Sequence, residues 1–482
     1  MKEYALNPFL PEYEYIPDGE PHVFDGRVYL YGSHDRFDGE RFCMNDYVCY
    51  SADCQDLKHW RYEGVIYDRR KDVRLKEERH ELWAPDVVRG KDGRYYLYYC
   101  PDDSIRSIGV AVCDSPAGKY EFYGLVHDKE GKVIGEREGD TIAFDPGVFM
   151  DEDGTCYLYS GNGPRIVEDI GKEPKASVVM ILEDDMVTVR EEPKKLLPVL
   201  GVAAGTGYEG HEFFEASSIR KIRGKYYLVY SSVHLHELCY AISDRPDGGF
   251  QYGGVIVSNA DIVENSEAKN SIGNNHGGIE CINGKYYIFY HRQTNATMHS
   301  RQACAEEIII DEDGKICQVP ITSCGLNGGP LPDNGIYPAS CVCLLYGKYP
   351  HEIAFSPDVK IKQPYVTQDH PDFDMETFTD TDKSQLPRQY IKNGQDGMHA
   401  VFRYFDIQEL SQIQVVVRGT ASGRLEIHTG ENGKIISEIQ IEPSDEWKVF
   451  SGSAEKCQGV QELHFCYHGE GILEFLEFGL KK

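Results

Sequence analysis

Five similar short stretches recur along the chain, and they constrain its fold more than any other feature of the sequence. They are DGRVYLYGSHD from Asp25, DGRYYLYYC from Asp92, DGTCYLYSG from Asp153, RGKYYLVYSS from Arg223 and NGKYYIFYHR from Asn283. In each copy a glycine-containing turn leads into a run of aromatic and β-branched residues, which is the pattern of a β-hairpin. Each glycine follows the previous one by 60 to 70 residues. A constant period of this kind indicates an array of similar units.

A unit of this length holds four short strands and their loops. Five four-stranded sheets packed radially make a five-bladed β-propeller, in which each blade buries both faces against its neighbours. We therefore predict an all-β fold with a propeller over residues 1–320. The alternatives are a long β-sandwich or two unrelated all-β domains, neither of which accounts for five copies in register.

Composition limits the partners. The 482 residues are 41% hydrophobic, enough for one large core and a smaller second one. The 79 acidic and 50 basic residues give a net charge of −29, which repels nucleic acid and anionic lipid, so neither partner is expected. The start shows no signal-peptide pattern and no later run resembles a membrane span, so we expect a cytoplasmic protein. The 15 scattered cysteines are expected to be buried, reduced thiols.

Chemically capable side chains precede all five repeats. Seven to nine residues before the repeat glycines stand Asp18, Asp86, Asp145, Glu215 and His276. The first strand of every propeller blade lines the central axis, so these positions are expected to converge on one pocket. Crowded carboxylates raise the pKa of at least one of them through like-charge repulsion and desolvation. Glycoside hydrolysis needs this combination of one protonated and one ionised carboxyl group.

The stretches around these positions also carry a family resemblance. In chain order they are YIPDGEPHVFDGRVYLYGSHD, LWAPDVV, FDPGVFMDEDG, HEFFEASSIRKIRGKYYLVYSS, and NNHGG followed by FYHRQT. Together they resemble glycoside hydrolase family 43 over about residues 5–320. The resemblance implies a five-bladed propeller and an inverting enzyme that acts on arabinofuranosyl and xylosyl linkages. One departure is that Gly19 follows Asp18 where many relatives have proline, which affects the expected shape of that loop.

The resemblance assigns three catalytic residues. Asp18 resembles the general base that activates water, Glu215 the general acid, and Asp145 the third acidic residue, which orients the acid and raises its pKa. From the residues alone, Asp18 could instead cap a P-D-G turn, Glu215 could be a salt-bridge partner in the core wall, and Asp145 could belong to a turn before a strand.

Four residues are predicted to bind substrate: Trp83, Asp86, His276 and Arg292. Trp83 offers a flat face to sugar C–H groups or packs between blades. Arg292 resembles a pocket arginine that holds a sugar hydroxyl or a catalytic carboxylate. His276 resembles an axial histidine that approaches a central calcium ion, or it is a core histidine. The chemistry is expected to need no cofactor, and the resemblance implies a structural calcium ion on the propeller axis. His34 and Asp35 are expected to be exposed.

The pattern changes after the fifth repeat. Residues 321–363 are turn-rich and are expected to be a linker packed along the propeller. Residues 364–482 contain short alternating strands, which predict a β-sandwich of jelly-roll type. This segment resembles carbohydrate-binding module family 6, most clearly in HGEGILEFLEF. Tyr390 and Trp447 are the first candidates for a sugar platform, and the alternative is a sandwich that only shields the propeller.

These features predict an exo-acting inverting hydrolase that removes terminal α-L-arabinofuranosyl or β-D-xylosyl residues from hemicellulose-derived oligosaccharides. The expected partner is an oligosaccharide containing arabinose or xylose, and nothing indicates the oligomeric state. The alternatives are a propeller that binds sugar without cleaving it, and a hydrolase directed at galactan or fructan. Three clustered carboxylates favour hydrolysis, because a neutral sugar can be bound without crowding anionic groups.

Overall fold

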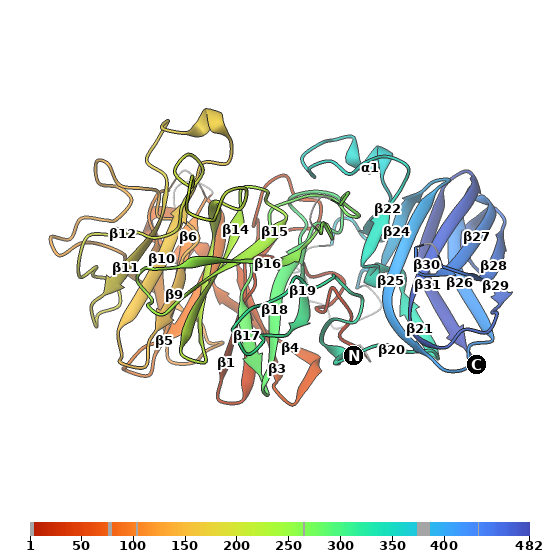
Figure 1. The fold of residues 1–482 in the computed structure, drawn as a ribbon, viewed down its shortest axis with the longest axis horizontal. Coiled ribbons are helices and arrows are strands. Elements are labelled where there is room, and N and C mark those ends of the chain that lie inside the picture. The colour runs from red at the N-terminus through yellow and green to blue at the C-terminus, as the bar shows by residue number, and fades with distance from the viewer. Residues whose placement is uncertain (1–3, 76–79, 103–104, 264–265, 374–385, 432) are drawn as a thin grey trace.

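The computed structural model describes residues 4–75, 80–102, 105–263, 266–373, 386–431 and 433–482. Its regular secondary structure is almost entirely β-strand, in two parts that lie side by side (Figure 1). The N-terminal part is a ring of small sheets and the C-terminal part is a two-sheet sandwich. Short helical turns connect some of the strands, namely η1 (Arg69–Lys71), η2 (Val73–Leu75), η3 (Val167–Asp169), η4 (Gly325–Asn327), η5 (Ala339–Cys341) and α1 (Val359–Lys362).

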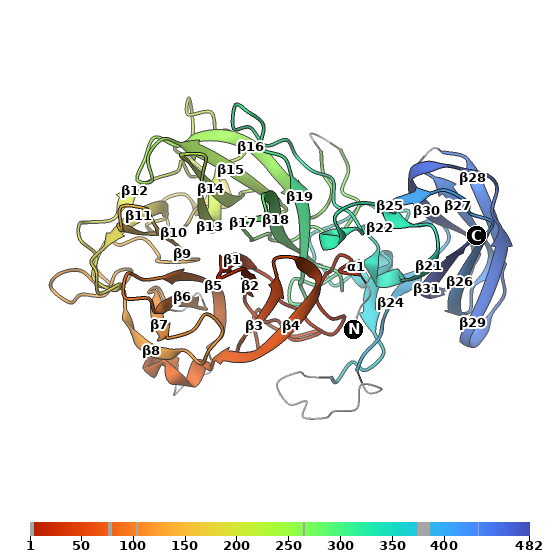
Figure 2. The same cartoon turned by 90° about the horizontal axis from the view of Figure 1, so that it is seen from below.

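The ring is a five-bladed propeller, as the repeats predict. Figure 2 shows its sheets arranged around a common axis, with the first strand of each blade innermost. Four blades have four antiparallel strands and the fifth has three. The strands are β1 (Glu20–Phe24), β2 (Arg27–Tyr31), β3 (Tyr47–Asp53) and β4 (Asp56–Tyr67); β5 (Leu82–Arg89), β6 (Tyr95–Pro101), β7 (Gly109–Cys113) and β8 (Glu121–Leu125); β9 (Gly147–Met150), β10 (Cys156–Asn162), β11 (Ala176–Leu182) and β12 (Lys194–Lys195); β13 (Phe213–Ile222), β14 (Lys225–Ser232), β15 (Glu237–Ser243) and β16 (Gln251–Ser258); and β17 (Ile279–Ile282), β18 (Lys285–Arg292) and β19 (Gln302–Ile308).

The repeated glycines form the turns between the first and second strands of the blades. All five have φ between 79° and 85°, a left-handed conformation that glycine adopts without strain. Asp25, Arg223 and Asn283, each directly before its glycine, also have positive φ. Two consecutive residues with positive φ match the twist of a tight hairpin. The repeated sequence is therefore the first hairpin turn of each blade together with the second strand.

The aromatic and aliphatic residues after each turn fill five separate cores, one between each pair of neighbouring blades. Blades 1 and 2, for example, bury Tyr31 and Tyr47 against Leu97 and Tyr99. Blades 1 and 5 close the ring, burying Leu30 against Phe289. The other three cores lie between blades 2 and 3, 3 and 4, and 4 and 5. Because every sheet buries both faces, its strands are apolar on both sides.

The C-terminal part is a sandwich of two six-stranded sheets. Phenylalanine side chains fill the space between the sheets, with Phe402, Phe465 and Phe478 fully buried. Its strands are β20 (Leu331–Pro332), β21 (Gly335–Pro338), β22 (Leu344–Tyr346), β23 (Tyr365–Gln368), β24 (Gln389–Gly394), β25 (Met398–Ile407), β26 (Gln412–Gly419), β27 (Ser422–Thr429), β28 (Ile435–Ile441), β29 (Ser444–Ser453), β30 (Gly459–Glu470) and β31 (Leu473–Lys481).

The segment expected to be a linker is more ordered than predicted. Its strands β20 and β22 pair with β25, and β21 pairs with β31, so they belong to the sandwich sheets. The residues between β22 and β23 form a loop that carries α1 at the junction of the two parts (Figure 1). The turn-rich sequence hides these strands because each is only two to four residues long.

Tyr390 and Trp447 do not form an open sugar platform. Tyr390 is buried, and the two rings meet edge to face with centroids 5.4 Å apart. The guanidinium of Arg418 lies 4.3 Å from the centre of the Trp447 ring and pairs with Glu474. The face that a sugar would need is therefore occupied by an arginine.

All 15 cysteines are free and most are buried, as predicted. Among the described residues, no helix has the length and apolar character needed to cross a membrane.

Candidate active site

Four of the five residues predicted to converge on one pocket do so, and Asp86 does not. Asp18 lies just before β1, Asp145 just before β9, Glu215 within β13 and His276 just before β17. All four line one pocket at the propeller axis, with a volume of about 220 Å³. Backbone irregularities occur at three of these four residues. Asp18 and Asp145 have φ of 56° and 44°, and β13 has a β-bulge at Glu215.

Asp18 is buried beside a cation. Arg301 Nη1 lies 3.0 Å from Asp18 Oδ1, and the Ser33 hydroxyl donates a 2.5 Å hydrogen bond to Oδ2. Burial by itself raises the pKa of Asp18, but the charge of Arg301, helped by the nearby histidines and Ser33, outweighs it and lowers the pKa below its ordinary value. Asp18 is therefore ionised at neutral pH.

His291 completes the surroundings of Asp18. Its Nδ1 accepts a 3.1 Å hydrogen bond from the Asp18 backbone N–H, so the ring proton is on Nε2, which donates to the carbonyl oxygen of Asn274 at 2.7 Å. Burial lowers the pKa of His291 to about 3, so the ring is neutral. It fixes the backbone that carries the carboxylate.

Arg301 is itself held by Asp35. Its Nε and Nη2 lie 2.9 and 3.0 Å from the two carboxylate oxygens of Asp35, a bidentate pair. All three charged residues are buried, so Asp18, Arg301 and Asp35 form a buried triad. The expectation that His34 and Asp35 are exposed is wrong. Each is less than 3% exposed, because Asp35 pairs with the buried Arg301 and His34 lies 3.2 Å from the buried Glu14.

Arg292, predicted to be the pocket arginine, does not reach the pocket. Its Nη2 donates to the carbonyl oxygen of Val342 at 2.9 Å, at the junction with the sandwich. Consecutive residues of a strand point to opposite faces. On β18, His291 faces Asp18, so Arg292 faces away. Arg301, ten residues beyond His291 and directly before β19, takes the predicted place, and the sequence offers no motif that identifies it.

The surroundings of Glu215 raise its pKa, whereas those of Asp18 lower the pKa of Asp18. Its Oε2 accepts a 3.3 Å hydrogen bond from Asn162, whose own side-chain oxygen accepts from Lys175 at 2.9 Å. Burial and then the negative charge of Asp18 raise the pKa of Glu215 to about 8, against the opposing charges of Arg301, Lys175 and Arg165. Glu215 is therefore mostly protonated at neutral pH.

Asp145 lies between Cys100 and His276. Its backbone N–H donates to Cys100 Sγ at 3.3 Å, and its Oδ2 lies 3.7 Å from His276 Nδ1. Burial, followed by the charges of Glu215 and Asp18, raises the pKa of Asp145 well above its ordinary value. Three carboxyl groups so close together cannot all be ionised, and the pocket keeps at least one proton at neutral pH.

The walls of the pocket are apolar and aromatic. Trp83 lines it, as predicted for a substrate-binding residue, with Phe42 and Phe144 on either side. The ring centroids of Trp83 and Phe144 are 5.6 Å apart, and those of Trp83 and Phe42 are 5.7 Å apart. Such walls suit the C–H faces of a neutral sugar.

The sequence profile of the glycosyl hydrolases family 43 matches residues 7–316. The chain belongs to glycosyl hydrolase family 43. A relative from Thermoclostridium stercorarium, named xylosidase/arabinosidase, is 47% identical over 100% of this chain and 99% of its own length.

Two solved structures are also similar. A family 43 β-xylosidase/α-arabinofuranosidase from a compost microbial metagenome, solved with xylotriose in a calcium-free form, has a TM-score of 0.52 and 30% identity, and covers 66% of this chain and 98% of its own. A family 43 arabinoxylan arabinofuranohydrolase from Bacillus subtilis, solved with cellotetraose, has a TM-score of 0.51 at 20% identity over 98% of this chain and 96% of its own. The second likeness shows that the propeller-plus-sandwich architecture has a precedent. The family 43 chain described here is a glycoside hydrolase.

Asp86, predicted to bind substrate at the pocket rim, does not line the pocket. It is fully buried within β5. One oxygen lies 2.6 Å from His22 Nε2, and the other accepts a 2.7 Å hydrogen bond from the backbone N–H of Val148 in β9. Asp86 therefore ties neighbouring blades of the family 43 propeller together.

Two polar atoms on the axis lack a partner. His276 Nε2 and Glu20 Oε1 are buried, have no hydrogen bond, and lie 3.9 Å apart. Burial, and then the charge of Asp86, raises the pKa of Glu20 to about 8. Glu20, His22 and Asp86 also bring possible ligand atoms within 4.8 Å of one another. Carboxylate oxygens are the ligands that calcium prefers, so this part of the axis fits a cation. Glu20 was missed in the sequence, where it appears only as the first residue of a strand.

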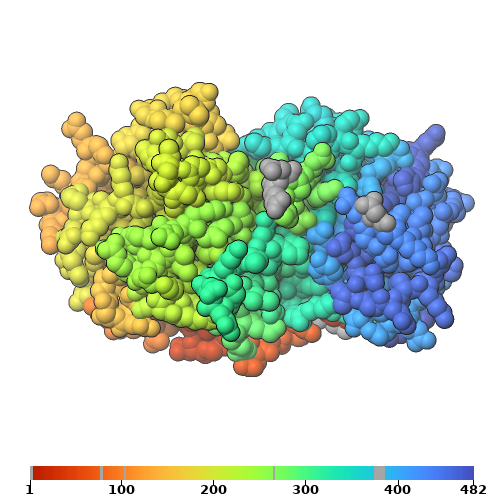
Figure 3. Space-filling view, in the orientation of Figure 1, coloured from red at the N-terminus to blue at the C-terminus, as the bar shows by residue number. Residues whose placement is uncertain are grey.

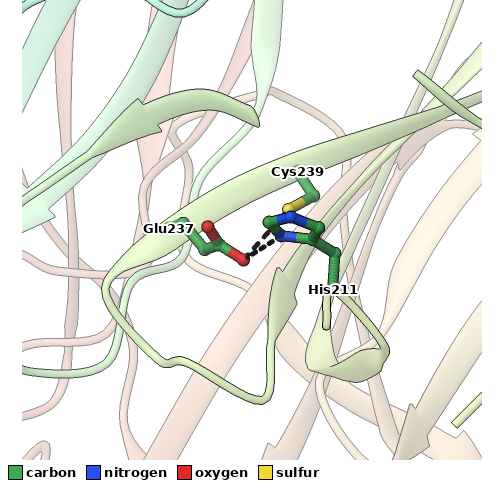
Figure 4. Close-up of side chains that lie close together, drawn as sticks. All are labelled: His211, Glu237 and Cys239. Carbon is green, nitrogen blue, oxygen red and sulfur yellow. Dashed lines mark hydrogen bonds and ion pairs between the residues drawn. The ribbon is translucent and has the colours of Figure 1, made fainter. Parts of the chain in front are cut away.

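A second cluster of possible metal ligands lies in blade 4, outside the pocket. It consists of His211, Glu237 and Cys239 (Figure 4). His211 Nδ1 and the Ser232 hydroxyl contact the same oxygen of Glu237, at 2.7 and 2.5 Å, and Cys239 Sγ lies 3.5 Å from it. Three donors already converge on this carboxylate, so the network is satisfied without an ion.

Proposed function

We propose that this family 43 enzyme is an exo-acting, inverting glycosidase that removes a terminal α-L-arabinofuranosyl or β-D-xylosyl residue from hemicellulose-derived oligosaccharides. The observation that carries the proposal is the pairing of an ionised Asp18 with a protonated Glu215 in one pocket. The names of the Thermoclostridium and compost relatives support the choice of sugars.

In this proposal the two carboxyl groups act on opposite sides of the glycosidic bond. Asp18 takes a proton from a water molecule while the water oxygen forms a bond to the anomeric carbon. Glu215 gives its proton to the glycosidic oxygen as the carbon–oxygen bond breaks, so that the leaving sugar departs as a neutral alcohol. The reaction leaves Asp18 protonated and Glu215 ionised, and exchange with solvent restores both.

Asp145 supports the acid in this scheme. Its carboxyl group is buried near Asp18 and Glu215. The negative charges of these two residues favour a proton on Asp145. The contact with His276 and the hydrogen bond from its backbone to Cys100 fix its position. Asp145 is therefore proposed to orient Glu215 and to help keep one proton on the carboxyl groups of the pocket.

The shape of the pocket supports exo action. Its volume of about 220 Å³ lies below the range of roughly 300–1,000 Å³ typical of drug-sized ligands, and its floor is buried. One terminal sugar fits such a space, whereas a continuous polymer needs an open cleft. The apolar walls favour a neutral sugar.

We also propose that the axis binds a calcium ion in a structural role. Glu20 and His276 would hold it, directly or through water, because their orphaned atoms face each other. A bound divalent cation supplies positive charge that favours the ionised form of Glu20 and compensates the buried carboxylates.

Hydrolysis of p-nitrophenyl α-L-arabinofuranoside and p-nitrophenyl β-D-xyloside tests the proposed function directly. We expect turnover of at least one of them, and NMR of the first-formed sugar should show the anomer opposite to that of the substrate. Binding of both sugars without turnover would favour the sugar-binding alternative, and a product that keeps the substrate's anomeric configuration would exclude inversion.

A further inference from the structure

Two side chains from outside the propeller complete the wall of the pocket. Ile353 and Phe355, in the loop between β22 and α1, line the same pocket as Asp18 and Glu215. Phe355 is 60% exposed and Ile353 is 36% exposed. Both side chains leave apolar area in water at the mouth of the pocket, and a ligand that covered it would gain from the burial.

Backbone contacts fix this loop on the propeller. Ile353 forms a parallel β-bridge with Ile272, and the Ala354 N–H donates to the Ile272 carbonyl oxygen at 2.8 Å. The base of the loop is closed by Gln363, whose side chain donates to the Tyr349 carbonyl oxygen at 2.6 Å and accepts from the Gly347 N–H at 3.0 Å. The position of Phe355 is thus set by the chain on both sides of it.

The far end of the loop is held between the propeller and the sandwich. Lys360, on α1, forms a 2.5 Å ion pair with Asp38 of blade 1. Asn393 of β24 donates to the carbonyl oxygens of Lys360, Ile361 and Gln363 at 2.9 to 3.1 Å. In Figure 3 the turquoise surface of this segment stands at the top of the molecule, across a notch from the yellow loops of blade 3. The docked sandwich therefore presents Phe355 to the pocket.

Aromatic rings connect Phe355 with the catalytic floor. The ring centroids of Phe355 and Phe42 are 6.1 Å apart, and Phe42 in turn packs against Trp83 at 5.7 Å. Phe355 also lies 6.0 Å from the ring of His299. The wall formed by Phe355, Phe42 and Trp83 runs from the exposed mouth to the buried carboxyl groups.

From this arrangement, and resting on the proposed function, we propose that Phe355 and Ile353 bind the sugar on the leaving-group side of the scissile bond. The terminal sugar must lie at the buried floor, between Asp18 and Glu215. The next sugar along the chain then lies at the mouth, where Phe355 is the exposed aromatic ring. A neutral pentopyranose such as a xylosyl unit presents C–H groups that suit this face.

The part of the chain that resembles other family 43 propellers ends before this loop. The family profile ends at residue 316, before the loop. The compost enzyme aligns over 98% of its own length to 66% of this chain, which is the extent of a propeller alone. In this enzyme, therefore, the polypeptide beyond the propeller contributes to the leaving-group side of the pocket.

The test compares Phe355→Ala with the parent enzyme on two substrates that carry the same terminal sugar and differ only in the leaving group. We expect kcat/KM on xylobiose or an arabinosyl-xylooligosaccharide to fall about tenfold, mainly through KM. The glycosyl fluoride of the same sugar has a single atom as its leaving group, so its kcat/KM should be unchanged. Phe355→Trp should keep kcat/KM on the oligosaccharide near the parental value. Ile361→Ala is the matched control, since Ile361 is 70% exposed on α1 and does not line the pocket.

Calorimetry supplies a readout that does not depend on turnover. Phe355→Ala should weaken binding of xylotriose while leaving the affinity for free xylose unchanged. An equal loss on the oligosaccharide and the fluoride, or an equal loss in Ile361→Ala, would overturn the proposal, as would an unchanged xylotriose affinity. A parent that hydrolyses neither substrate yet loses xylotriose affinity in Phe355→Ala would sink the proposed function and leave this binding site standing.

Discussion

Arg301 places one guanidinium nitrogen 3.0 Å from Asp18, the carboxylate with the lowered pKa in the pocket. The two residues are 283 positions apart in the chain. The remaining nitrogens of Arg301 are held by Asp35, so the cation cannot turn away from Asp18. This relationship keeps the proposed base ionised in a site where burial alone would protonate it.

The first prediction concerns this arginine. Arg301→Lys keeps a positive charge but cannot contact Asp18 and Asp35 together, so the pKa of Asp18 should rise. Asp18 would then be protonated at a higher pH, and the acid limb of the kcat/KM profile should move upward by about one pH unit. Arg292→Lys is the control, because Arg292 is equally buried but faces away from the pocket. An unshifted acid limb in Arg301→Lys would remove Arg301 from the role assigned to it.

The second prediction concerns the alkaline side of the same profile. Glu215 must be protonated to act as an acid, and its pKa is raised to about 8. Activity on an unactivated oligosaccharide should therefore fall as the pH rises through about 8. A glycosyl fluoride needs no protonation of its leaving group, so its profile should lack this limb. The same alkaline limb on both substrates would assign it to another group.

The third prediction separates the two catalytic roles. Glu215→Gln cannot supply a proton and should lower the rate on an unactivated oligosaccharide by about 10²–10⁴-fold. Aryl glycosides with acidic phenols should lose much less, because the phenolate departs without help. Asp18→Asn should damage both substrates alike, since water must be activated in each case. Parental turnover of the oligosaccharide by Glu215→Gln would show that the acid is misassigned.

The fourth prediction tests the axial ion. Added calcium should raise the melting temperature and a chelator should lower it, because an ion that binds only the folded state stabilises it. Glu20→Gln removes the proposed ligand charge and should abolish the response. Glu280→Gln is a close control. Glu20 and Glu280 both pair with Arg220, at 3.4 and 3.6 Å, but Glu280 is not in the axial cluster. A calcium response that persists in Glu20→Gln would place the ion elsewhere.

The fifth prediction concerns Asp86, which links neighbouring blades and does not line the pocket. Asp86→Ala leaves the Val148 N–H without its buried acceptor and should lower the free energy of unfolding by about 1–3 kcal/mol, measured by urea denaturation. Asp92→Ala removes an aspartate of the same blade whose pair with Arg94 is exposed, and should cost at most about 1 kcal/mol. If Asp86→Ala instead raised KM at unchanged stability, its predicted place at the substrate would be restored.

Local sequence predicts the blades well, because each hairpin is encoded by neighbouring residues. The glycine turns and the apolar strands after them require no information from the rest of the chain. The convergence of Asp18, Asp145, Glu215 and His276 also follows from the repeat, since equivalent positions in a propeller meet at the axis. The catalytic candidates were therefore accessible before the structure.

The predictions that proved wrong concern residues whose role depends on the direction of the side chain or on a partner distant in the chain. Arg292 and His291 are adjacent on β18, and only the placement of that strand against its neighbours decides which of them faces Asp18. Asp86 occupies an axial position, but its hydrogen bonds run to β9 and His22, which no local pattern reveals. Asp35 lacks any sign of burial in the sequence because its partner is 266 residues away.

The number of blades, their first hairpin turns and the acidic residues brought to the axis can all be predicted from the repeats, because each repeat encodes its hairpin with neighbouring residues. Tertiary structure alone decided the protonation states of those acids, the choice of Arg301 over Arg292, and the arrival of Phe355 at the mouth of the pocket. Each of these depends on which residues distant in the chain are packed together. In the buried floor a single neighbouring charge changes a protonation state, and at the mouth a single exposed ring changes what the pocket can bind.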